Sequence, residues 1–137
     1  MKNMILIAVL LSSTLLKAQQ ITVPDPNAPV VTFEKDTIDY GTIPHNANGY
    51  RYFIFTNTGK SPLIINYVTT SCGCLVASWP KRLIKPGQID TIKAHYDTHR
   101  VGVFVKTMTM VSNANPTIHL LHITGKVLPD PPESTSK

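Results

Sequence analysis

The chain has little charge and few of the motifs that mark an enzyme. Charged residues make up 15% of its 137 residues, and it contains one tryptophan and two cysteines. It has no G-x-S-x-G, no H-E-x-x-H, no phosphate-binding loop and no dinucleotide fingerprint. These absences argue against a hydrolase, although catalytic triads can assemble from residues far apart in sequence. We therefore expect a protein that is not an enzyme, and we assign no catalytic residue.

Long apolar runs are also missing, apart from one near the start. Met4–Leu16 is uncharged and mostly apolar, but it is shorter than the roughly 20 residues that a membrane span needs. Lys2 precedes this run and Ala18 follows it, in the order of a secretory signal peptide. We expect residues 1–18 to be this signal, with cleavage after Ala18. The protein is then exported, periplasmic or extracellular, with no transmembrane span in its mature form.

The excess of basic over acidic residues is mild. Thirteen Lys and Arg against eight Asp and Glu give a net charge of +5, and Lys2 and Lys17 belong to the expected signal. Basic residues cluster only around Lys81-Arg82, a pattern typical of a solvated loop. A nucleic-acid partner is therefore not indicated. The expected partner is an envelope or extracellular protein.

Short segments rich in β-branched and aromatic residues alternate with turn residues along the middle of the chain. The turns recur about every ten residues, as in a sandwich or barrel, and no window has a sustained helical period. We predict an all-β fold, an immunoglobulin-like antiparallel β-sandwich of about seven strands. The expected segments are Val30–Glu34, Asp36–Tyr40 (ended by Gly41), Tyr50–Asn57, Pro62–Thr69, Leu75–Trp79 as a short edge piece, Gln88–Asp97, Gly102–Ser112 and Pro116–Val127.

The two ends of the chain differ in composition from its middle. Residues 19–29 hold three prolines and little apolar content, which is typical of a flexible lead-in. Residues 128–137, LPDPPESTSK, predict a disordered tail. The sandwich domain is therefore expected over residues 30–127, a length that suits one domain.

Alternation along the strands predicts which side chains are buried. Phe53 and Phe55 share one face of their strand, as Leu121 and Ile123 do near the end of the chain, and all four are expected in the core.

The other face of the Tyr50–Asn57 strand carries Tyr50, Tyr52 and Ile54, which are not strongly polar. We therefore expect that strand to be central and partly covered on both sides. The last hairpin and Asp36–Tyr40 are the expected free edges for partner strands.

A series of short motifs runs along the middle of the chain: Phe53-x-Phe55-x-Asn57-Thr58-Gly59, Pro62-Leu63, Ser71-Cys72-Gly73-Cys74, Trp79-Pro80, Pro86-Gly87, Tyr96-Asp97, Gly102-x-Phe104-x-Lys106, Ser112-Asn113 and Gly125-x-Val127. Together these motifs resemble a secreted bacterial family, domain of unknown function 1573, and the resemblance covers residues 33–127. It implies an immunoglobulin-like fold related to domains of cilium and centrosome proteins. It also implies an envelope or extracellular location, and it supplies neither an activity nor a catalytic residue.

Cys72 and Cys74 are the chemically most unusual pair, and three roles are open to them. In an extended strand their Cα atoms would lie about 6.6 Å apart, at the upper limit for a disulfide unless Gly73 adopts a conformation that other residues avoid. A disulfide over so short a loop stabilises little and would be easily reduced, which permits a redox role. Two thiolates also bind soft ions such as Cu(I). The third role is structural, as small buried residues.

Two further groups of residues are weaker candidates. His95, Asp97 and His99 share one strand face if that strand extends so far, and two histidines with a carboxylate can bind a metal. Alternate residues of one strand splay apart, however, so a polar outer face is the favoured interpretation. Trp79 is expected as a packing anchor, with a role in partner binding as the alternative.

These observations favour a non-enzymatic envelope or secreted protein that acts as a binding or structural module without a cofactor. The alternative is a thiol–disulfide redox or copper-handling protein that uses Cys72-Gly73-Cys74.

Overall fold

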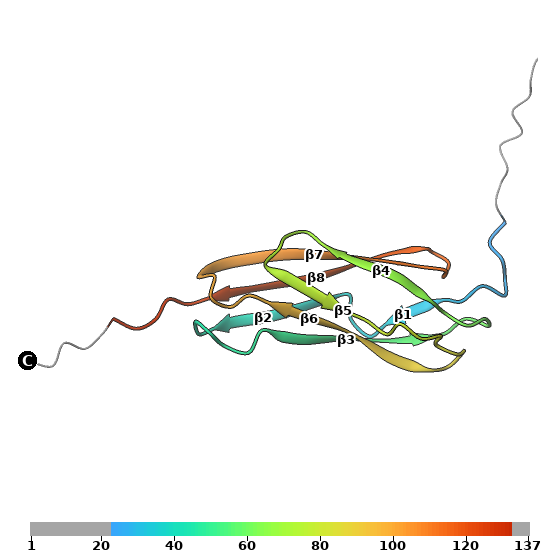
Figure 1. The fold of residues 1–137 in the computed structure, drawn as a ribbon, viewed down its shortest axis with the longest axis horizontal. Coiled ribbons are helices and arrows are strands. Elements are labelled where there is room, and N and C mark those ends of the chain that lie inside the picture. The colour runs from blue at the N-terminus through green and yellow to red at the C-terminus, as the bar shows by residue number, and fades with distance from the viewer. Residues whose placement is uncertain (1–22, 133–137) are drawn as a thin grey trace, which may run out of the picture.

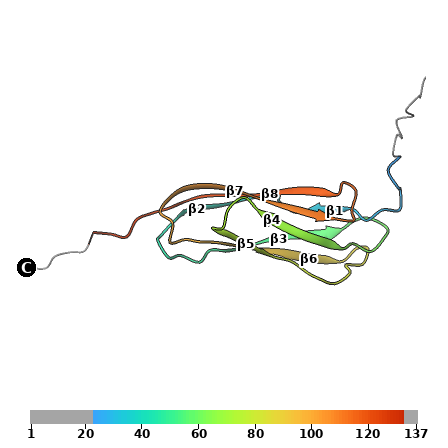
Figure 2. The same ribbon diagram turned by 45° about the horizontal axis from the view of Figure 1, so that its top comes forward.

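The alternating segments pair into two β-sheets that bury their apolar faces against each other. The computed structural model describes residues 23–132, which contain no helix and therefore none that could cross a membrane. One sheet has the order β1-β3-β6-β5 and the other β2-β8-β7-β4 (Figure 1). The two layers lie face to face in the rotated view as well (Figure 2). The strands are β1 (Val31–Phe33), β2 (Thr37–Ile43), β3 (Tyr50–Asn57), β4 (Ile65–Thr70), β5 (Leu75–Ser78), β6 (Ile89–Tyr96), β7 (Gly102–Ser112) and β8 (Ile118–Val127).

The predicted all-β sandwich is confirmed, with eight strands where about seven were expected. The two N-terminal segments expected from the sequence belong to different sheets. β1 pairs antiparallel with β3 in one sheet, and after a short crossover β2 pairs parallel with β8 in the other. The predicted signal peptide, residues 1–18, lies outside the described residues.

The predicted core is confirmed. The side chains of Phe53, Phe55, Leu121 and Ile123 are all at most 1% exposed. They meet between the sheets because a period of two directs alternate side chains inward.

β3 is central, as expected, but its outer face is not covered. Tyr50 is 43% and Tyr52 is 55% exposed, and only Ile54 is partly buried on that face. The alternation was therefore interpreted correctly for the inner face, whereas the expected cover on the outer face was wrong.

One of the two expected free edges is correct. β2 is an edge strand, and it continues through Gly41, where the strand was expected to end. Gly41 adopts a positive φ of 67° inside a register shift between Asp39 and Thr42, a backbone conformation that glycine accepts without strain. The last hairpin is not an edge along most of its length, because β4 pairs with β7 and β2 pairs with β8 from His122 onward.

The segments that flank the sandwich on both sides contact it in the part of the chain that the structure describes. In the expected lead-in, the N–H of Ala28 donates to the carbonyl of Asp25 and Pro29 is buried. This segment passes so close to Gly59 that a Cβ there would lie 2.4 Å from the Val30 nitrogen. In the expected tail, His45 Nδ1 lies 2.8 Å from an Asp130 carboxylate oxygen.

A buried asparagine holds the end of β3 in place. Asn57 is fully buried, and its side-chain amide donates to the carbonyls of Ser61 and Ile84, both at 2.9 Å. Its side-chain oxygen accepts the N–H of Gly59 at 3.1 Å. One side chain therefore satisfies three backbone groups and fixes the turn into β4.

A second polar contact closes the opposite end of the sandwich. The Tyr40 hydroxyl donates to the carbonyl of Gly49 at 2.8 Å, and that carbonyl also accepts the N–H of Tyr96. The Tyr40 ring packs edge-on against Phe104, with ring centroids 5.3 Å apart. Burial raises the pKa of Tyr40 to about 12, although the nearby Arg51 cation opposes the shift.

Replacement of Asn57 tests the first contact. Asn57→Ala leaves buried carbonyls without donors, so we expect the free energy of unfolding to fall by about 3 kcal/mol. Urea unfolding followed by circular dichroism measures this change. Asn66→Ala, at an exposed position of β4, is the matched control and should change stability by less than about 0.5 kcal/mol. Equal losses in the two variants would contradict the role of Asn57.

Replacement of Tyr40 tests the second contact. Tyr40→Phe removes one hydrogen bond, with an expected loss of about 1 kcal/mol at neutral pH. Because the folded-state pKa of about 12 lies above the ordinary value of 10.0, the contribution of Tyr40 is complete below pH 10. It is lost as the pH rises from 10 to 12. The stability difference between wild type and Tyr40→Phe should therefore shrink over this range, as measured by urea unfolding at successive pH values. A constant difference would contradict the burial of the hydroxyl.

Candidate functional site

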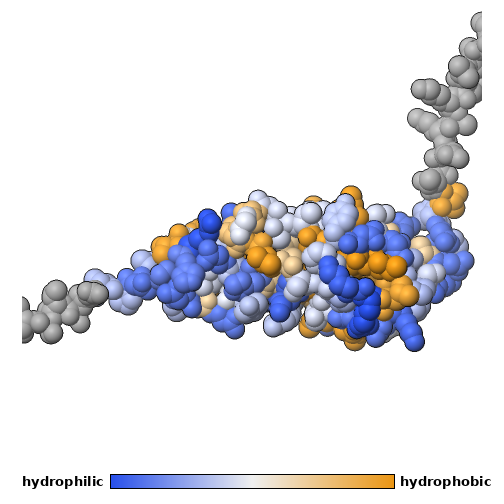
Figure 3. Space-filling view, in the orientation of Figure 1, coloured by the Kyte–Doolittle hydropathy of each residue, from blue (hydrophilic) through white to orange (hydrophobic). Residues whose placement is uncertain are grey.

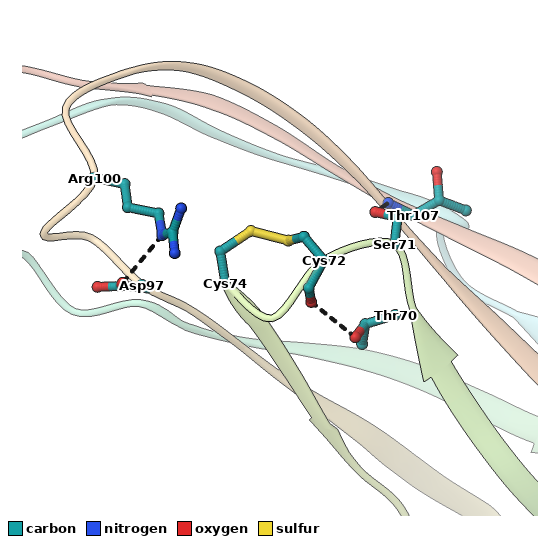
Figure 4. The surroundings of a disulfide bond; sticks show 7 residues. All are labelled: Thr70, Ser71, Cys72, Cys74, Asp97, Arg100 and Thr107. Atoms are coloured by element: carbon teal, nitrogen blue, oxygen red, sulfur yellow. Dashed lines mark hydrogen bonds and ion pairs between the residues drawn. A yellow bond between two sulfur atoms is a disulfide. The ribbon is translucent and has the colours of Figure 1, made fainter.

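The Cys-Gly-Cys segment is the corner at which the chain passes from one sheet to the other. It joins β4 of one sheet to β5 of the other, and Cys72 and Cys74 form a disulfide across Gly73 (Figure 4). The two Cα atoms are 5.2 Å apart, closer than in an extended strand. The chain turns at this point, and the N–H of Leu75 donates to the Cys72 carbonyl at 3.4 Å. This turn brings the two Cα atoms close together. A local disulfide was one of the three roles left open by the sequence.

Hydrogen bonds hold both sides of this corner. The Thr70 hydroxyl donates to the Cys72 carbonyl at 3.0 Å (Figure 4). The N–H of Asp97 donates to the Cys74 carbonyl at 2.9 Å, which ties the corner to the end of β6. The backbone around the disulfide is therefore fixed from the strand before it and from the neighbouring strand.

The two sulfur-bearing residues are unequally buried. Cys74 is 5% exposed and belongs to the core, whereas Cys72 is partly exposed and packs against the core. Gly73 is exposed, has no positive φ, and no atom lies within 4 Å of where its Cβ would be. Gly73 could have shortened the spacing through a conformation that other residues avoid, but it does not adopt one. The turn alone brings the cysteines together.

The structure does not gather the three candidate metal ligands of β6 and its loop. His95 stacks on Tyr50, with ring centroids 4.2 Å apart. Asp97 lies beyond the end of β6, where it pairs with Arg100 at 3.3 Å. His99 packs edge-on against His45 at 5.7 Å. No group of three or more His, Cys, Asp or Glu side chains in the described residues is arranged to hold a metal ion.

Asp97 instead has a local role in its loop. Its carboxylate accepts the N–H of His99 at 3.1 Å, and this hydrogen bond is the main reason that the pKa of Asp97 is lowered. The arrangement stabilises the turn between β6 and β7 rather than an active site.

Trp79 lies directly after β5 and packs partly against the core. The Lys81 ammonium lies 3.1 Å from the centroid of its ring. The indole N–H is buried and has no hydrogen-bond partner among the described residues. Beside it is a shallow cleft of about 400 Å³ that Tyr52 and Lys93 also line. Trp79 therefore acts as an anchor at the edge of a surface depression.

The outer face of the β3–β6–β5 sheet exposes aromatic and aliphatic side chains and carries little charge. Lys93 is the one charged residue among the outward positions of these three strands, and no acidic residue occupies any of them. On the side shown in Figure 3, apolar patches interrupt the polar surface of the domain. In the sequence, this face was indicated by Tyr50 and Tyr52 at alternate positions of one strand. We had expected other parts of the protein to cover these two side chains. The most exposed apolar or aromatic residues of the face are Tyr50, Tyr52, Val76 and Ile89, at 43–62% exposure.

Solved structures with the same architecture support the immunoglobulin-like fold. A protein of unknown function from Porphyromonas gingivalis matches with a TM-score of 0.66 at 16% identity, over 79% of this chain and 51% of that one. This chain therefore spans about half the length of that protein. The ASH/PapD-like domain 7 of human CEP192 matches with a TM-score of 0.65 at 9% identity, over 80% and 93% of the two chains. The YadV chaperone matches with a TM-score of 0.51 at 15% identity, over 77% and 54%.

At these identities the likeness shows the fold alone. No curated protein matches the sequence. Residues 31–127, nearly the whole sandwich, match the sequence profile of a family described as protein of unknown function, DUF1573. The resemblance inferred from the Cys-Gly-Cys corner and its flanking motifs is thus confirmed, and the chain belongs to the DUF1573 family.

Proposed function

We propose that this chain is a non-enzymatic module that binds a protein partner in the bacterial envelope or outside the cell. The observation that carries the proposal is the outer face of the β3–β6–β5 sheet, with its exposed tyrosines and aliphatic side chains. An exposed sheet face of this composition is typical of a protein-interaction surface, since aromatic residues supply most of the binding energy at interfaces.

The charges on this face indicate the chemistry of the partner. Lys93 stands exposed between the strands, and its ammonium lies 5.3 Å from the ring of Tyr50. Lys81 lies over Trp79 at the border of the face. A partner surface with apolar residues flanked by carboxylates would complement these groups. The signal-like residues 1–18 support an exported location, and the fold shared with the YadV chaperone supports a role in protein binding.

A second candidate function, thiol–disulfide exchange, is favoured by the disulfide at the corner and by the partial exposure of Cys72. In this proposal a partner dithiol attacks the disulfide, forms a mixed disulfide, and leaves as a disulfide while Cys72 and Cys74 become thiols. The reduced pair would also provide two soft ligands for Cu(I), which is the copper-handling version of this proposal.

Substitutions on the two sheets test the binding face. Full-length protein produced with its own N-terminus is used to capture partners from an envelope extract, and affinity for the captured partner is then measured. Tyr52→Lys adds a second cation beside Lys93 and removes an aromatic contact. We expect affinity to fall about thirtyfold, which corresponds to about 2 kcal/mol. Val103→Lys, at an exposed position of β7 in the other sheet, is the control and should leave affinity unchanged. Equal losses from both variants, or no saturable partner, would contradict the proposal.

Removal of the disulfide separates the two functions. Because the loop is very short, Cys72→Ser/Cys74→Ser should lower the free energy of unfolding by only about 1–2 kcal/mol. If the module is purely a binding protein, partner capture is unchanged and the reduction potential of the wild type lies below about −300 mV. A potential above about −250 mV, together with loss of function in the double variant, would favour the exchange role. Mass spectrometry of the reduced protein after addition of micromolar Cu(I) tests the copper version.

A further inference from the structure

The crossover between β1 and β2 leaves a split along one side of the sandwich. The N–H of Asn115 donates to the Pro29 carbonyl at 2.9 Å, and further along, the N–H of His122 donates to the Asp36 carbonyl at 2.7 Å. These two bonds tie the N-terminal segment to the hairpin turn and to the middle of β8. Between them, β1 pairs with β3 in the other sheet (Figure 1). The start of β8 is therefore left without a neighbouring strand among the described residues.

One wall of the split is the start of β8. Backbone N–H and C=O groups point alternately to the two sides of a strand. The N–H of His122 faces the β2 side, and the carbonyl of Thr117 faces β7, where it accepts the N–H of Ser112. The N–H and C=O groups of Ile118 and Leu120 therefore face the split. β2 begins opposite His122, so no strand pairs with these groups.

The opposite wall is the free side of β1. The carbonyl of Val30 accepts the N–H of Thr58, and the N–H of Glu34 donates to the Ile54 carbonyl, so these even-numbered residues face β3. By the same alternation, the backbone groups of Val31 and Phe33 point away from β3 and toward the split. Backbone groups without strand partners among the described residues thus border the split on both sheets.

A crevice of about 640 Å³ occupies the split, and Val31, Phe33, His119 and Leu120 are among the residues that line it. Phe33 and His119 meet across it with ring centroids 5.8 Å apart. The Nδ1 atom of His119 is buried and has no hydrogen-bond partner among the described residues. The backbone groups of Ile118 and Leu120 border this crevice without strand partners among the described residues, so a bound strand can pair with them.

The other half-edge created by the crossover, along the start of β3, is partly capped by side chains. There the N–H of Tyr50 donates to the Asn48 side chain, and Arg51 donates to the Tyr50 carbonyl. A second depression, lined by Arg51, Tyr52 and Ile54, lies along this half-edge. On the far side of the sandwich, β4 and β5 lie beside each other and are joined by the disulfide corner. The split at β1 and β8 is the half-edge without such side-chain caps among the described residues.

We propose that this split binds an extended peptide segment of a partner protein, which pairs with the backbone of β8, covers the free side of β1 and inserts an apolar side chain against Phe33. A peptide backbone supplies donors and acceptors to the Ile118 and Leu120 groups at the spacing of a strand. The carboxylates of Glu34 and Asp36 are exposed at the rim with Lys35 between them. This net negative rim selects an occupant in which a lysine or arginine follows the inserted apolar residue.

This inference rests on the proposed binding function, because it specifies how one segment of the partner is held. It is nevertheless tested separately, since the split and the outer face of the β3–β6–β5 sheet involve different residues. A second copy of this chain, or ordered water alone, are the other occupants that the test identifies.

The experiment uses the full chain and a set of capped synthetic peptides, Thr-x-Thr-x-Lys-Thr, in which x is Val, Ile, Leu or Phe. Binding is followed by NMR and by amide hydrogen exchange. At a peptide concentration ten times Kd, exchange of the amides of Val31, Phe33, Ile118 and Leu120 should slow about tenfold. Peptides with N-methylated backbones, or with Glu in place of Lys, should bind more weakly. If no member of the set binds at millimolar concentration, or if these four amides are unprotected in the complex, the inference is overturned.

A backbone variant supplies the matched control. Leu120→Pro removes an N–H that faces the split and spares the β7–β8 ladder, so the protein should fold while peptide affinity falls fivefold or more, on the order of one hydrogen bond. Tyr52→Lys should leave peptide affinity unchanged.

If Leu120→Pro does not fold, amide protection in the wild type decides the question. Protection of the four amides at high protein concentration without peptide would assign the split to a second copy, and peptide binding that persists unchanged in Leu120→Pro would overturn the inference. Loss of partner capture in Tyr52→Lys tests only the outer face of the β3–β6–β5 sheet and says nothing about the split.

Discussion

The N-terminal segment of this protein must serve two sheets at once, and much of the structure follows from that constraint. Residues 31–33 complete one sheet beside β3, and residues 37–43 complete the other beside β8. Neither sheet receives a full-length edge strand. Each neighbour is therefore left half covered, and a depression lies along each of the two gaps. The fold is stable because the apolar faces still meet between the sheets, but the crossover leaves polar backbone exposed in a crevice.

Close approaches between chain segments secure the two ends of the sandwich. At one end, the lead-in passes over Gly59 at a distance that no side chain would allow, and Asn57 ties the adjacent turn to β3. At the other end, Gly49 approaches the Tyr96 carbonyl so closely that a Cβ would lie 2.1 Å from its oxygen. These contacts hold the backbone at the two ends of the sandwich. Proline content describes the local stiffness of a chain, but it does not show which surface that chain packs against.

The candidate functional surfaces are separate from the chemically unusual residues. The disulfide lies at the corner between β4 and β5, with one cysteine buried in the core, and hydrogen bonds from both neighbouring strands restrain it. The exposed tyrosines lie on β3, and the crevice lies between β1 and β8. The position of Cys72 and Cys74 was evident from their spacing. Neither the face nor the crevice was evident, because each depends on which strands become neighbours.

The sequence by itself determined the strands, the inward faces of the core and the family, because side-chain alternation and turn chemistry are local properties. Phe53, Phe55, Leu121 and Ile123 are buried as their periodicity requires. Only the tertiary structure decided that the last hairpin is central, that Tyr50 and Tyr52 face solvent, and that His95, Asp97 and His99 stay apart. The physical reason is that strand order and the position of a crossover are set by long-range pairing, which no local pattern of residues encodes.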